Sequence, residues 1–326
     1  MPRCVPLYSA AWPEPTHELR EHRDDEFDIA EVHGAILRLK RNKATGPDLV
    51  RNEYIQQAKC LLPCWTLLFN CCLREGSLPS SWKEAQLMVI PKGKGDPREV
   101  SAWRGIAKKC CPYKLLSSLI AARLTTFLEQ LKLLPDEQHG FRELRSTHSA
   151  CSALLTDVHE ALKVPGGKLY AVFVDFRAAF DTGSRVIALD KLAQWGVPPK
   201  LLRLLAEVLQ QDKVVLDDGI TELAPFDQTT GYAQGDNLSP LLFTVLVSDL
   251  PKIIQEKHAV KLLMYADDLV IYSPHRFQVS QALGTLRRES EDLGLMINMS
   301  KTLAMKFRRG GRLAKDDHFV WERKDA

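Results

Sequence analysis

The chain has 326 residues, of which 45% are hydrophobic and 26% are charged, and these proportions are ordinary for a globular protein. Its net charge of +3 excludes a uniformly basic surface, so a nucleic-acid-binding surface would have to be local. No apolar run approaches membrane-spanning length, and residues 1–6 contain no signal-peptide core. We therefore expect an intracellular protein, in the nucleus or the cytoplasm, with no membrane partner.

The eight cysteines suit a reducing compartment in which they remain thiols. Those between residues 60 and 72 have a spacing that suggests zinc, but leucines and aromatic residues alternate with them at helical spacing and no paired histidines follow. We interpret these cysteines, and three later ones, as small core residues. The residues concerned are Cys60, Cys64, Cys71, Cys72, Cys110, Cys111 and Cys151.

The first half of the chain predicts mainly helices. Residues 1–25 are rich in Pro, Glu and Arg without periodicity, which predicts a flexible leader. Asp28 is then expected to be a helix N-cap, with Glu31 completing a capping box. Apolar periodicity predicts further helices over residues 53–73, 116–131 and 149–163 and a strand over residues 86–90.

The second half adds strands that end in acidic residues. Residues 169–174 form an apolar run of strand length that is followed by Asp175. Two further apolar runs, 260–264 and 269–273, flank Tyr265-Ala266-Asp267-Asp268 and predict a β-hairpin with two carboxylates at its tip. Other segments predict helices over 189–195, 201–209, 240–250 and 279–293 and a strand pair over 213–216 and 228–232. This alternation predicts an α+β fold with a mainly antiparallel sheet.

The paired aspartates at the hairpin tip indicate a divalent cation. Adjacent carboxylates repel each other and resist the loss of water, and hard oxygen ligands suit Mg²⁺ or Mn²⁺. If the strand before Asp175 lies beside the hairpin, Asp175 and Asp267 would share two ions that activate an attacking hydroxyl and stabilise a leaving phosphate oxygen. Asp268 is expected to be a weaker ligand or an outer partner. The alternative for each motif alone is a plain strand end or a plain turn.

Several further segments accompany these two in a fixed order between about residue 27 and about residue 307. Together they resemble the reverse transcriptases of non-LTR (LINE-type) retrotransposons. The matching segments are residues 42–48, 138–142 with 146–147, 173–181, 231–243, 265–268 and 293–298 with 301–302. The sequence departs from the family pattern at Ala233, at Asn237 and at residues 103–107.

The resemblance implies a right-hand polymerase fold made of fingers and palm. It divides the chain into a leader (1–25), fingers and fingers/palm helices (26–164), a palm with the catalytic motifs (165–308) and a polar tail (309–326). Residues 185–228 would be a partly fingers-like insertion in the palm. No thumb-like segment follows the palm motifs, so we expect a fragment of a larger element.

The resemblance also implies roles for residues around the incoming nucleotide. Phe180 is expected to be a steric gate against the 2′-hydroxyl of a ribonucleotide, and the alternative is a core phenylalanine. Gln234 and Gly235 are expected to line the nascent base pair, or else to form an ordinary loop before a helix. Lys92 and Arg104 are expected to bind the triphosphate, or else to belong to a solvated basic loop.

Three more basic residues have two interpretations each. Lys301 would donate a proton to the leaving pyrophosphate or hold a turn of the palm. Arg142 and Arg145 would contact template phosphates or form surface ion pairs.

The function implied is that of an RNA-directed DNA polymerase of a mobile element. It would use two Mg²⁺ ions, with Mn²⁺ as a substitute, together with an RNA template, a DNA primer and a deoxynucleoside triphosphate. Two alternatives remain: a nucleic-acid-binding palm scaffold without polymerisation, and an RNA-templated RNA polymerase or intron maturase. Ala266 and Phe180 favour deoxynucleotides.

Overall fold

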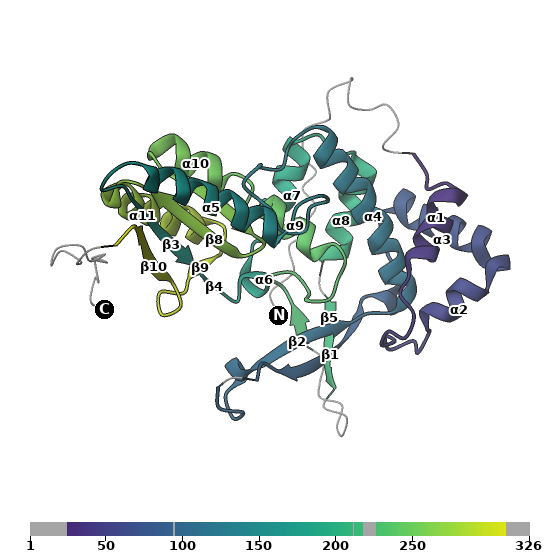
Figure 1. Cartoon of the computed structure of the whole chain (residues 1–326). Coiled ribbons are helices and arrows are strands. Elements are labelled where there is room, and N and C mark those ends of the chain that lie inside the picture. Colours follow the sequence, from purple (N-terminus) through teal and green to yellow (C-terminus); the bar gives the residue numbers. More distant parts are fainter. Residues whose placement is uncertain (1–24, 94, 211, 218–225, 311–326) are drawn as a thin grey trace. The chain divides into compact units, whose positions relative to one another are not determined.

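The computed structural model describes residues 25–93, 95–210, 212–217 and 226–310 (Figure 1). The leader expected over 1–25 and the tail expected over 309–326 therefore lie almost entirely outside the described residues. By packing, the chain divides into unit 1 (Met1–Leu131 and Ser184–Val245) and unit 2 (Lys132–Gly183 and Leu246–Ala326). The division into fingers up to residue 164 and palm from residue 165 stays a prediction. Among the described residues, no helix has both the length and the apolar character needed to span a membrane.

Unit 1 contains a four-stranded sheet in the order β2-β1-β5-β6, together with a group of helices. Strands β1 and β2 form an antiparallel ribbon, β5 runs parallel to β1, and β6 is antiparallel to β5. The strands are β1 (Glu84–Pro91), β2 (Trp103–Lys108), β5 (Asp212–Asp217) and β6 (Phe226–Gln228). The helices are α1 (Ile29–Arg38), α2 (Asn52–Gln57), α3 (Leu62–Glu75), α4 (Cys111–Gln130), α7 (Arg185–Gln194), α8 (Pro199–Leu209) and α9 (Ser239–Leu246).

Unit 2 contains a four-stranded, wholly antiparallel sheet in the order β10-β3-β8-β7. Its strands are β3 (Lys168–Val174), β7 (Lys261–Tyr265), β8 (Asp268–Ser273) and β10 (Leu303–Arg308), and a small second sheet pairs β4 (Phe176–Arg177) with β9 (Met296–Ile297). The helices are α5 (Thr147–Lys163), α6 (Ala179–Thr182), α10 (Leu250–Lys257) and α11 (Arg276–Asp292).

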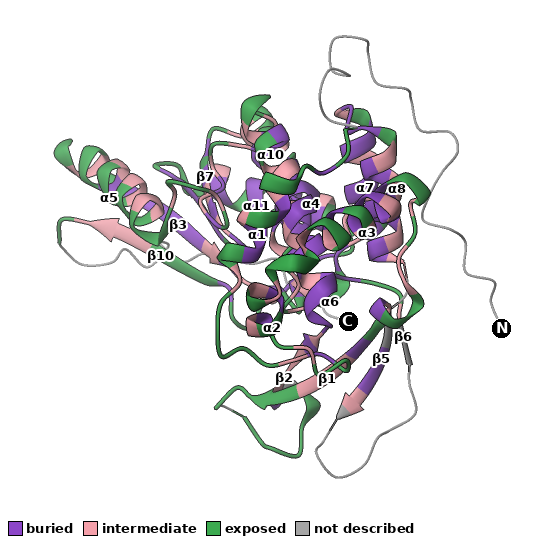
Figure 2. Cartoon of the chain, turned by 90° about the vertical axis from the view of Figure 1, so that its right-hand side faces the viewer, coloured by how far each residue is buried: buried purple, intermediate pink, exposed green. Residues whose placement is uncertain are grey.

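The central strands β3 and β8 of unit 2 are covered on both faces, which explains their apolar runs. On one face, Leu169 and Ala171 of β3 pack with Val158 of α5. Val172 and Ile271 point to the opposite face because side chains alternate along a strand, and both are 0% exposed. Helix α11 packs against β3 and β8. Only one residue of α5, Val158, is buried, so most of that helix is exposed in Figure 2.

The hairpin, the strand before Asp175 and most of the expected helices are confirmed, but the helix expected over 53–73 is wrong. It is divided into α2, a short 3-10 turn (Lys59–Leu61) and α3. Pro63 lies in the first turn of α3, where its missing N–H is harmless, whereas in a helix interior it would break the backbone hydrogen bonds. The helix expected over 240–250 is likewise divided into α9 and α10, and Pro251 lies in the first turn of α10.

Two smaller expectations also need correction. Asp28 caps α1 by accepting a hydrogen bond from the Glu31 amide at 2.7 Å, but the Glu31 carboxylate forms a salt bridge with Arg123 at 2.7 Å. The strand pair is present as β5 and β6, but β6 ends at Gln228 and residues 229–232 are not a strand. The carbonyl groups of Gln228, Thr230 and Gly231 point instead to the Arg185 side chain.

The cysteines of the described residues differ in burial, and Cys71 is only half-buried. Cys72, Cys110 and Cys111 are buried, as expected of core residues, and burial raises the pKa of the Cys72 and Cys110 thiols to about 11. Cys60, Cys64 and Cys151 are exposed, so the core interpretation is wrong for them. In α3 the buried face carries Phe69, Cys72 and Leu73, and Cys64 is exposed on that helix.

Candidate active site

The acidic hairpin is formed by β7 and β8, which pair up to Tyr265 opposite Asp268. Ala266 and Asp267 therefore form a two-residue turn. Ala266 has a φ of 58°, in the left-handed region that hairpin turns of this length require. The carboxylates of Asp267 and Asp268 are consequently fixed at the tip of the hairpin.

Asp175 is brought to the same end of the sheet by β3. Val174 pairs with Leu269 of β8, so the next residue, Asp175, lies beside Asp268 at the start of β8. The Asp175 backbone is held from the other side: its carbonyl accepts a hydrogen bond from the Asn298 amide at 2.7 Å, and its amide donates to the Thr302 hydroxyl at 3.4 Å. The structure thus places all three predicted acidic residues at one end of one sheet.

The electrostatics of this end favour a cation. The pKa of Asp268 is raised, first by loss of water around its carboxylate and then by the negative charges of Asp267 and Asp175. The Oδ2 atom of Asp175 is buried and accepts no hydrogen bond. Carboxylate oxygens that repel one another and are short of donors fit a divalent ion, because the ion replaces both the lost water and the missing donor.

The ready-made metal cluster expected from the sequence is not formed. Within the described ranges, no three His, Cys, Asp or Glu side chains gather closely enough to hold a metal ion. Mutual repulsion separates like charges at the turn. The Nζ atom of Lys301 lies 3.8 Å from the Oδ2 atom of Asp175 and supplies the neighbouring positive charge. The carboxylates of Asp175, Asp267 and Asp268 are suitable ligands for a divalent metal ion, although these side chains would have to rotate to bind it.

We predict that Asp268→Asn stabilises unit 2 at neutral pH. A carboxyl whose pKa is raised by folding binds more protons in the native state than in the unfolded state, so stability falls as the pH rises above its ordinary value of 3.8. The uncharged amide avoids this loss. Thermal melting should give a higher Tm for the variant at pH 7 than for the wild type. The difference should vanish below that ordinary pKa, and an equal gain at every pH would contradict this explanation.

Phe180, the predicted sugar gate, lies on the short helix α6 after Asp175. Its ring meets the ring of Phe141 edge to face, with the centroids 6.3 Å apart. Phe180 is only partly buried and Phe141 is 52% exposed, so the alternative of a core phenylalanine is not supported. Its role as a gate stays a prediction.

Arg142 and Arg145 lie between Gly140 and α5 and are held by local contacts. Arg142 donates to the carbonyl of Pro135 at 2.6 Å. Arg145 forms an ion pair with the carboxylate of Asp136, which is 92% exposed. The surface ion pair considered from the sequence is therefore present for Arg145, and contacts of either arginine with a template phosphate stay a prediction.

The remaining candidates belong to unit 1. Arg104 of β2 pairs with Ile90 of β1, and the exposed Lys92 follows directly after β1 with its amide donating to the Ala102 carbonyl at 2.8 Å. Both basic residues are thus on the β1–β2 ribbon. The carbonyl of Gln234 accepts a hydrogen bond from the Ala107 amide of β2 at 2.9 Å.

Gly235 lies against the same strand. Its φ is 106°, and a Cβ atom there would lie 3.2 Å from the Ala107 carbonyl oxygen. A glycine is therefore needed for the loop to approach β2 so closely. In unit 1 the structure brings Gln234 and Gly235 together with the strand that carries Arg104.

A sequence profile of the family described as "Reverse transcriptase (RNA-dependent DNA polymerase)" matches residues 90–318, which is more than half of the chain. The chain belongs to the reverse transcriptase family. Both predicted catalytic segments lie within the matched region.

Curated relatives agree with this assignment. The chain is 28% identical over 298 residues to the RNA-directed DNA polymerase from mobile element jockey of Drosophila melanogaster, a match that covers 86% of this chain and 31% of that protein. It is 26% identical to a Pol polyprotein of the retrotransposable element R2 from Popillia japonica, covering 73% of this chain and 34% of that protein. The chain thus spans about a third of the length of these relatives.

The solved structure of telomerase from Candida albicans has a similar fold. The TM-score is 0.53 at 13% identity, and the match covers 75% of this chain and 46% of the telomerase chain. Likeness at this identity concerns the fold alone. Together with the family match, the mixed helix and sheet architecture fits a polymerase fingers-and-palm fold.

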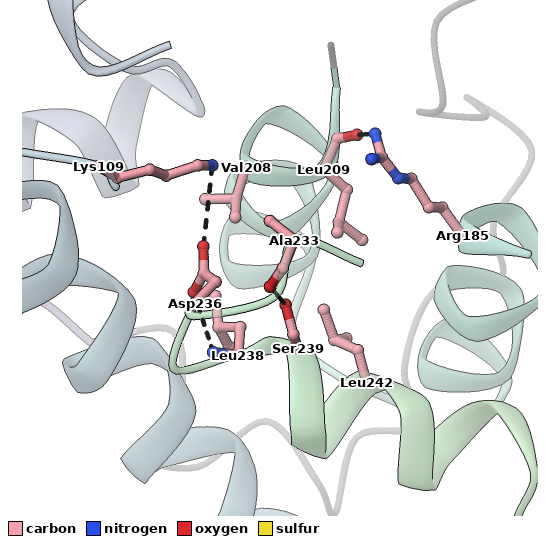
Figure 3. A pocket seen from close by; sticks show the side chains of 9 residues that line it. All are labelled: Lys109, Arg185, Val208, Leu209, Ala233, Asp236, Leu238, Ser239 and Leu242. Atoms are coloured by element: carbon pink, nitrogen blue, oxygen red, sulfur yellow. Dashed lines mark hydrogen bonds and ion pairs between the residues drawn. The ribbon is translucent and has the colours of Figure 1, made fainter. Parts of the chain in front are cut away.

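The sequence interpretation missed the role of Asp236, which follows Gly235. Its buried carboxylate accepts hydrogen bonds from Tyr113 and Ser117 of α4, both at 2.5 Å, and from the Leu238 amide at 3.0 Å. Lys109 lies 3.8 Å from it (Figure 3). The sequence contained one signal for such a role, because Asp236 stands between the expected nucleotide loop at Gln234 and a segment that predicts a buried helix. Its side-chain partners Tyr113, Ser117 and Lys109 are more than a hundred residues away in the chain, so they could not be identified from the sequence.

Arg185, at the start of α7, was also missed. Its side chain is 5% exposed and donates to the backbone carbonyls of Gly231, Leu209, Gln228 and Thr230. Figure 3 shows the guanidinium directed at the end of α8, where Leu209 lies. Arg185 therefore ties the segment before the Gln234 loop to the helices of unit 1.

Proposed function

We propose that this chain catalyses RNA-templated DNA synthesis by transferring nucleotides from deoxynucleoside triphosphates to the 3′-hydroxyl of a primer. One observation carries the proposal: in a member of the reverse transcriptase family, Asp175 and the Asp267-Asp268 hairpin lie at the same end of adjacent antiparallel strands. The partners would be an RNA template and a DNA primer, in the nucleus or the cytoplasm.

Asp175 and Asp267 would hold two Mg²⁺ ions, or Mn²⁺ ions in their place, and Asp268 would be the outer partner. When bound, such ions supply activation of the primer hydroxyl and stabilisation of charge on the phosphate oxygens. The residues themselves orient the reacting groups. The turn of β7 and β8 fixes the direction of Asp267, and the contacts with Asn298 and Thr302 fix Asp175. Lys301, beside Asp175, is suited to donate a proton to the leaving pyrophosphate.

In unit 1, Lys92 and Arg104 would bind the triphosphate, and Gln234 with Gly235 would line the nascent base pair. A lysine and an arginine on one ribbon supply a point charge and a planar fork of donors for phosphate oxygens. The Gln234 side chain offers a donor and an acceptor. Arg142 and Arg145 of unit 2 would contact template phosphates once the local contacts with Pro135 and Asp136 are exchanged.

The test is addition of a single nucleotide to a labelled DNA primer on an RNA template, with the purified chain and Mg²⁺. We expect addition of the complementary deoxynucleotide that depends on both template and metal. Addition of ribonucleotides with equal efficiency would identify an RNA polymerase instead. Tight binding of the primed template without any addition would identify a nucleic-acid-binding scaffold.

We predict that Phe180→Val relaxes the choice of sugar. If the ring excludes the 2′-hydroxyl by contact, a smaller side chain should raise ribonucleotide incorporation relative to deoxynucleotide incorporation by about 10- to 100-fold. The ratio of the two kcat/KM values is the measurement. Phe277→Val is the matched control, since Phe277 of α11 is 68% exposed. An unchanged ratio in the Phe180 variant would remove the gate from the proposal.

A further inference from the structure

Gln138 is a fully buried polar residue of unit 2 that the proposed chemistry does not use directly. It is 0% exposed and belongs to the segment of chain that precedes α5. Its side-chain Nε2 donates to the carbonyl of Ala266 at 3.2 Å, and its Oε1 accepts from the amide of Ala266 at 2.9 Å. One side chain therefore satisfies both backbone groups of the first turn residue of the acidic hairpin.

The backbone around Gln138 reinforces this contact. The amide of Met264 donates to the carbonyl of Glu137, and the amide of His139 donates to the carbonyl of Met264, both at 2.8 Å. Gln138 and Met264 thus form a parallel bridge at the edge of β7. The segment from Glu137 to Gly140 runs alongside the strand that leads into the turn.

Gly140 permits the close approach. A Cβ atom at this position would lie 2.2 Å from the backbone nitrogen of Ala266, a distance that no side chain tolerates. The Gly140 amide also donates to the Gln138 Oε1 at 2.8 Å, which fixes the orientation of the amide group. Both N–H donors face this oxygen, so the carboxamide has only one favourable orientation.

Ala266 needs such support because of its backbone conformation. Its φ of 58° is unfavourable for a residue with a Cβ, and a left-handed alanine persists only where its surroundings impose it. Asp267 follows immediately. A change in the backbone at Ala266 would therefore redirect the Asp267 and Asp268 carboxylates.

The same segment reaches the predicted sugar gate. Phe141, next to Gly140, makes the edge-to-face contact with Phe180. The Nδ1 atom of His139 is 2.7 Å from the Ser149 hydroxyl at the start of α5, which anchors the segment to that helix. One short segment is thus in contact with the acidic turn and with the aromatic ring after Asp175.

We propose that Gln138 is a positioning residue for nucleotidyl transfer, which holds Ala266 in its left-handed conformation and so aims Asp267 and Asp268. This inference rests on the proposed function, because it assigns Gln138 a part in the same reaction. It predicts a specific pH dependence. In Gln138→Glu, an ionised carboxylate repels the Ala266 carbonyl and the nearby aspartates, whereas a protonated one restores the missing donor.

The experiment measures kcat and KM for addition of a single deoxynucleotide between pH 6 and pH 8. We expect both Gln138→Glu and Gln138→Leu to lower kcat at pH 8 by about 10- to 100-fold, with KM for the nucleotide little changed, as for other residues that orient ligand groups. Relative to the wild type, the Glu variant should recover toward pH 6 and the Leu variant should not. Ser290→Ala is the control, because Ser290 is equally buried, belongs to the same unit and makes no side-chain hydrogen bond.

Suppose that the wild type extends primers. If kcat is then unchanged in both variants, or if only the KM for the nucleotide changes, the inference is overturned. Failure of the wild type to extend primers would refute the proposed function instead. Amide hydrogen exchange at Ala266 then decides the positioning claim by itself. Loss of protection at this amide in Gln138→Leu supports the claim, and wild-type protection in that variant overturns it.

Discussion

Asp267→Asn is expected to abolish nucleotide addition while leaving the fold intact. Asparagine keeps the shape of the side chain at the hairpin tip but removes the charge that would hold a divalent ion. Metal stabilisation of phosphoryl transfer contributes several kcal/mol to the barrier, and each 1.36 kcal/mol changes the rate tenfold, so kcat should fall on the order of 10³-fold or more. The same loss is expected for Asp175→Asn, because Asp175 lies at the same end of the sheet.

Single-turnover addition on the primed RNA template measures this effect. Asp292→Asn is the matched control, since Asp292 is an exposed carboxylate at the end of α11 in the same unit. Circular dichroism of each variant should match that of the wild type. An Asp267 variant whose rate stays within about tenfold of the wild type would show that its carboxylate is not a metal ligand.

Arg185→Met is expected to give the largest loss of stability. The substitution removes a buried guanidinium and leaves backbone carbonyls of Leu209, Gln228, Thr230 and Gly231 without this donor. Buried groups that lose their partner are costly, and we expect the free energy of unfolding of unit 1 to fall by about 3–5 kcal/mol.

Urea unfolding followed by tryptophan fluorescence tests this value. Of the six tryptophans, Trp65, Trp82, Trp103 and Trp195 lie in the described part of unit 1, so the signal reports mainly that unit. Arg74→Met is the control: Arg74 also belongs to unit 1, but its ion pair with Glu26 is exposed and should matter little. Equal midpoints for the two variants would show that the carbonyl contacts of Arg185 do not stabilise the unit.

The acidic strands could be predicted because their signals are local. Apolar runs of strand length on both sides of Asp267 and before Asp175 specified the hairpin and β3, and the structure confirms both. Helix continuity was harder to predict. The expected helix over 53–73 has apolar periodicity throughout, yet Pro63 begins a new helix within it. The missing N–H group of this proline set the helix boundary, although the apolar periodicity continues across it.

The buried polar contacts within each unit could not be predicted, since the partners are distant in sequence. Gln138 contacts Ala266 across 128 positions, and Asp236 contacts Tyr113 across 123. Neither glutamine nor aspartate indicates from the sequence alone which backbone group or hydroxyl it will meet. The sequence therefore predicted the acidic residues that the structure brings to one end of the unit 2 sheet, but not the buried glutamine that contacts the turn beside them.

The most direct test of the metal-binding claim is a crystal structure of the chain with Mn²⁺ and a primed RNA template, in which anomalous scattering locates the metal. We predict anomalous peaks in contact with the carboxylates of both Asp175 and Asp267. Peaks elsewhere in the chain, or an ion that contacts neither carboxylate, would contradict the account.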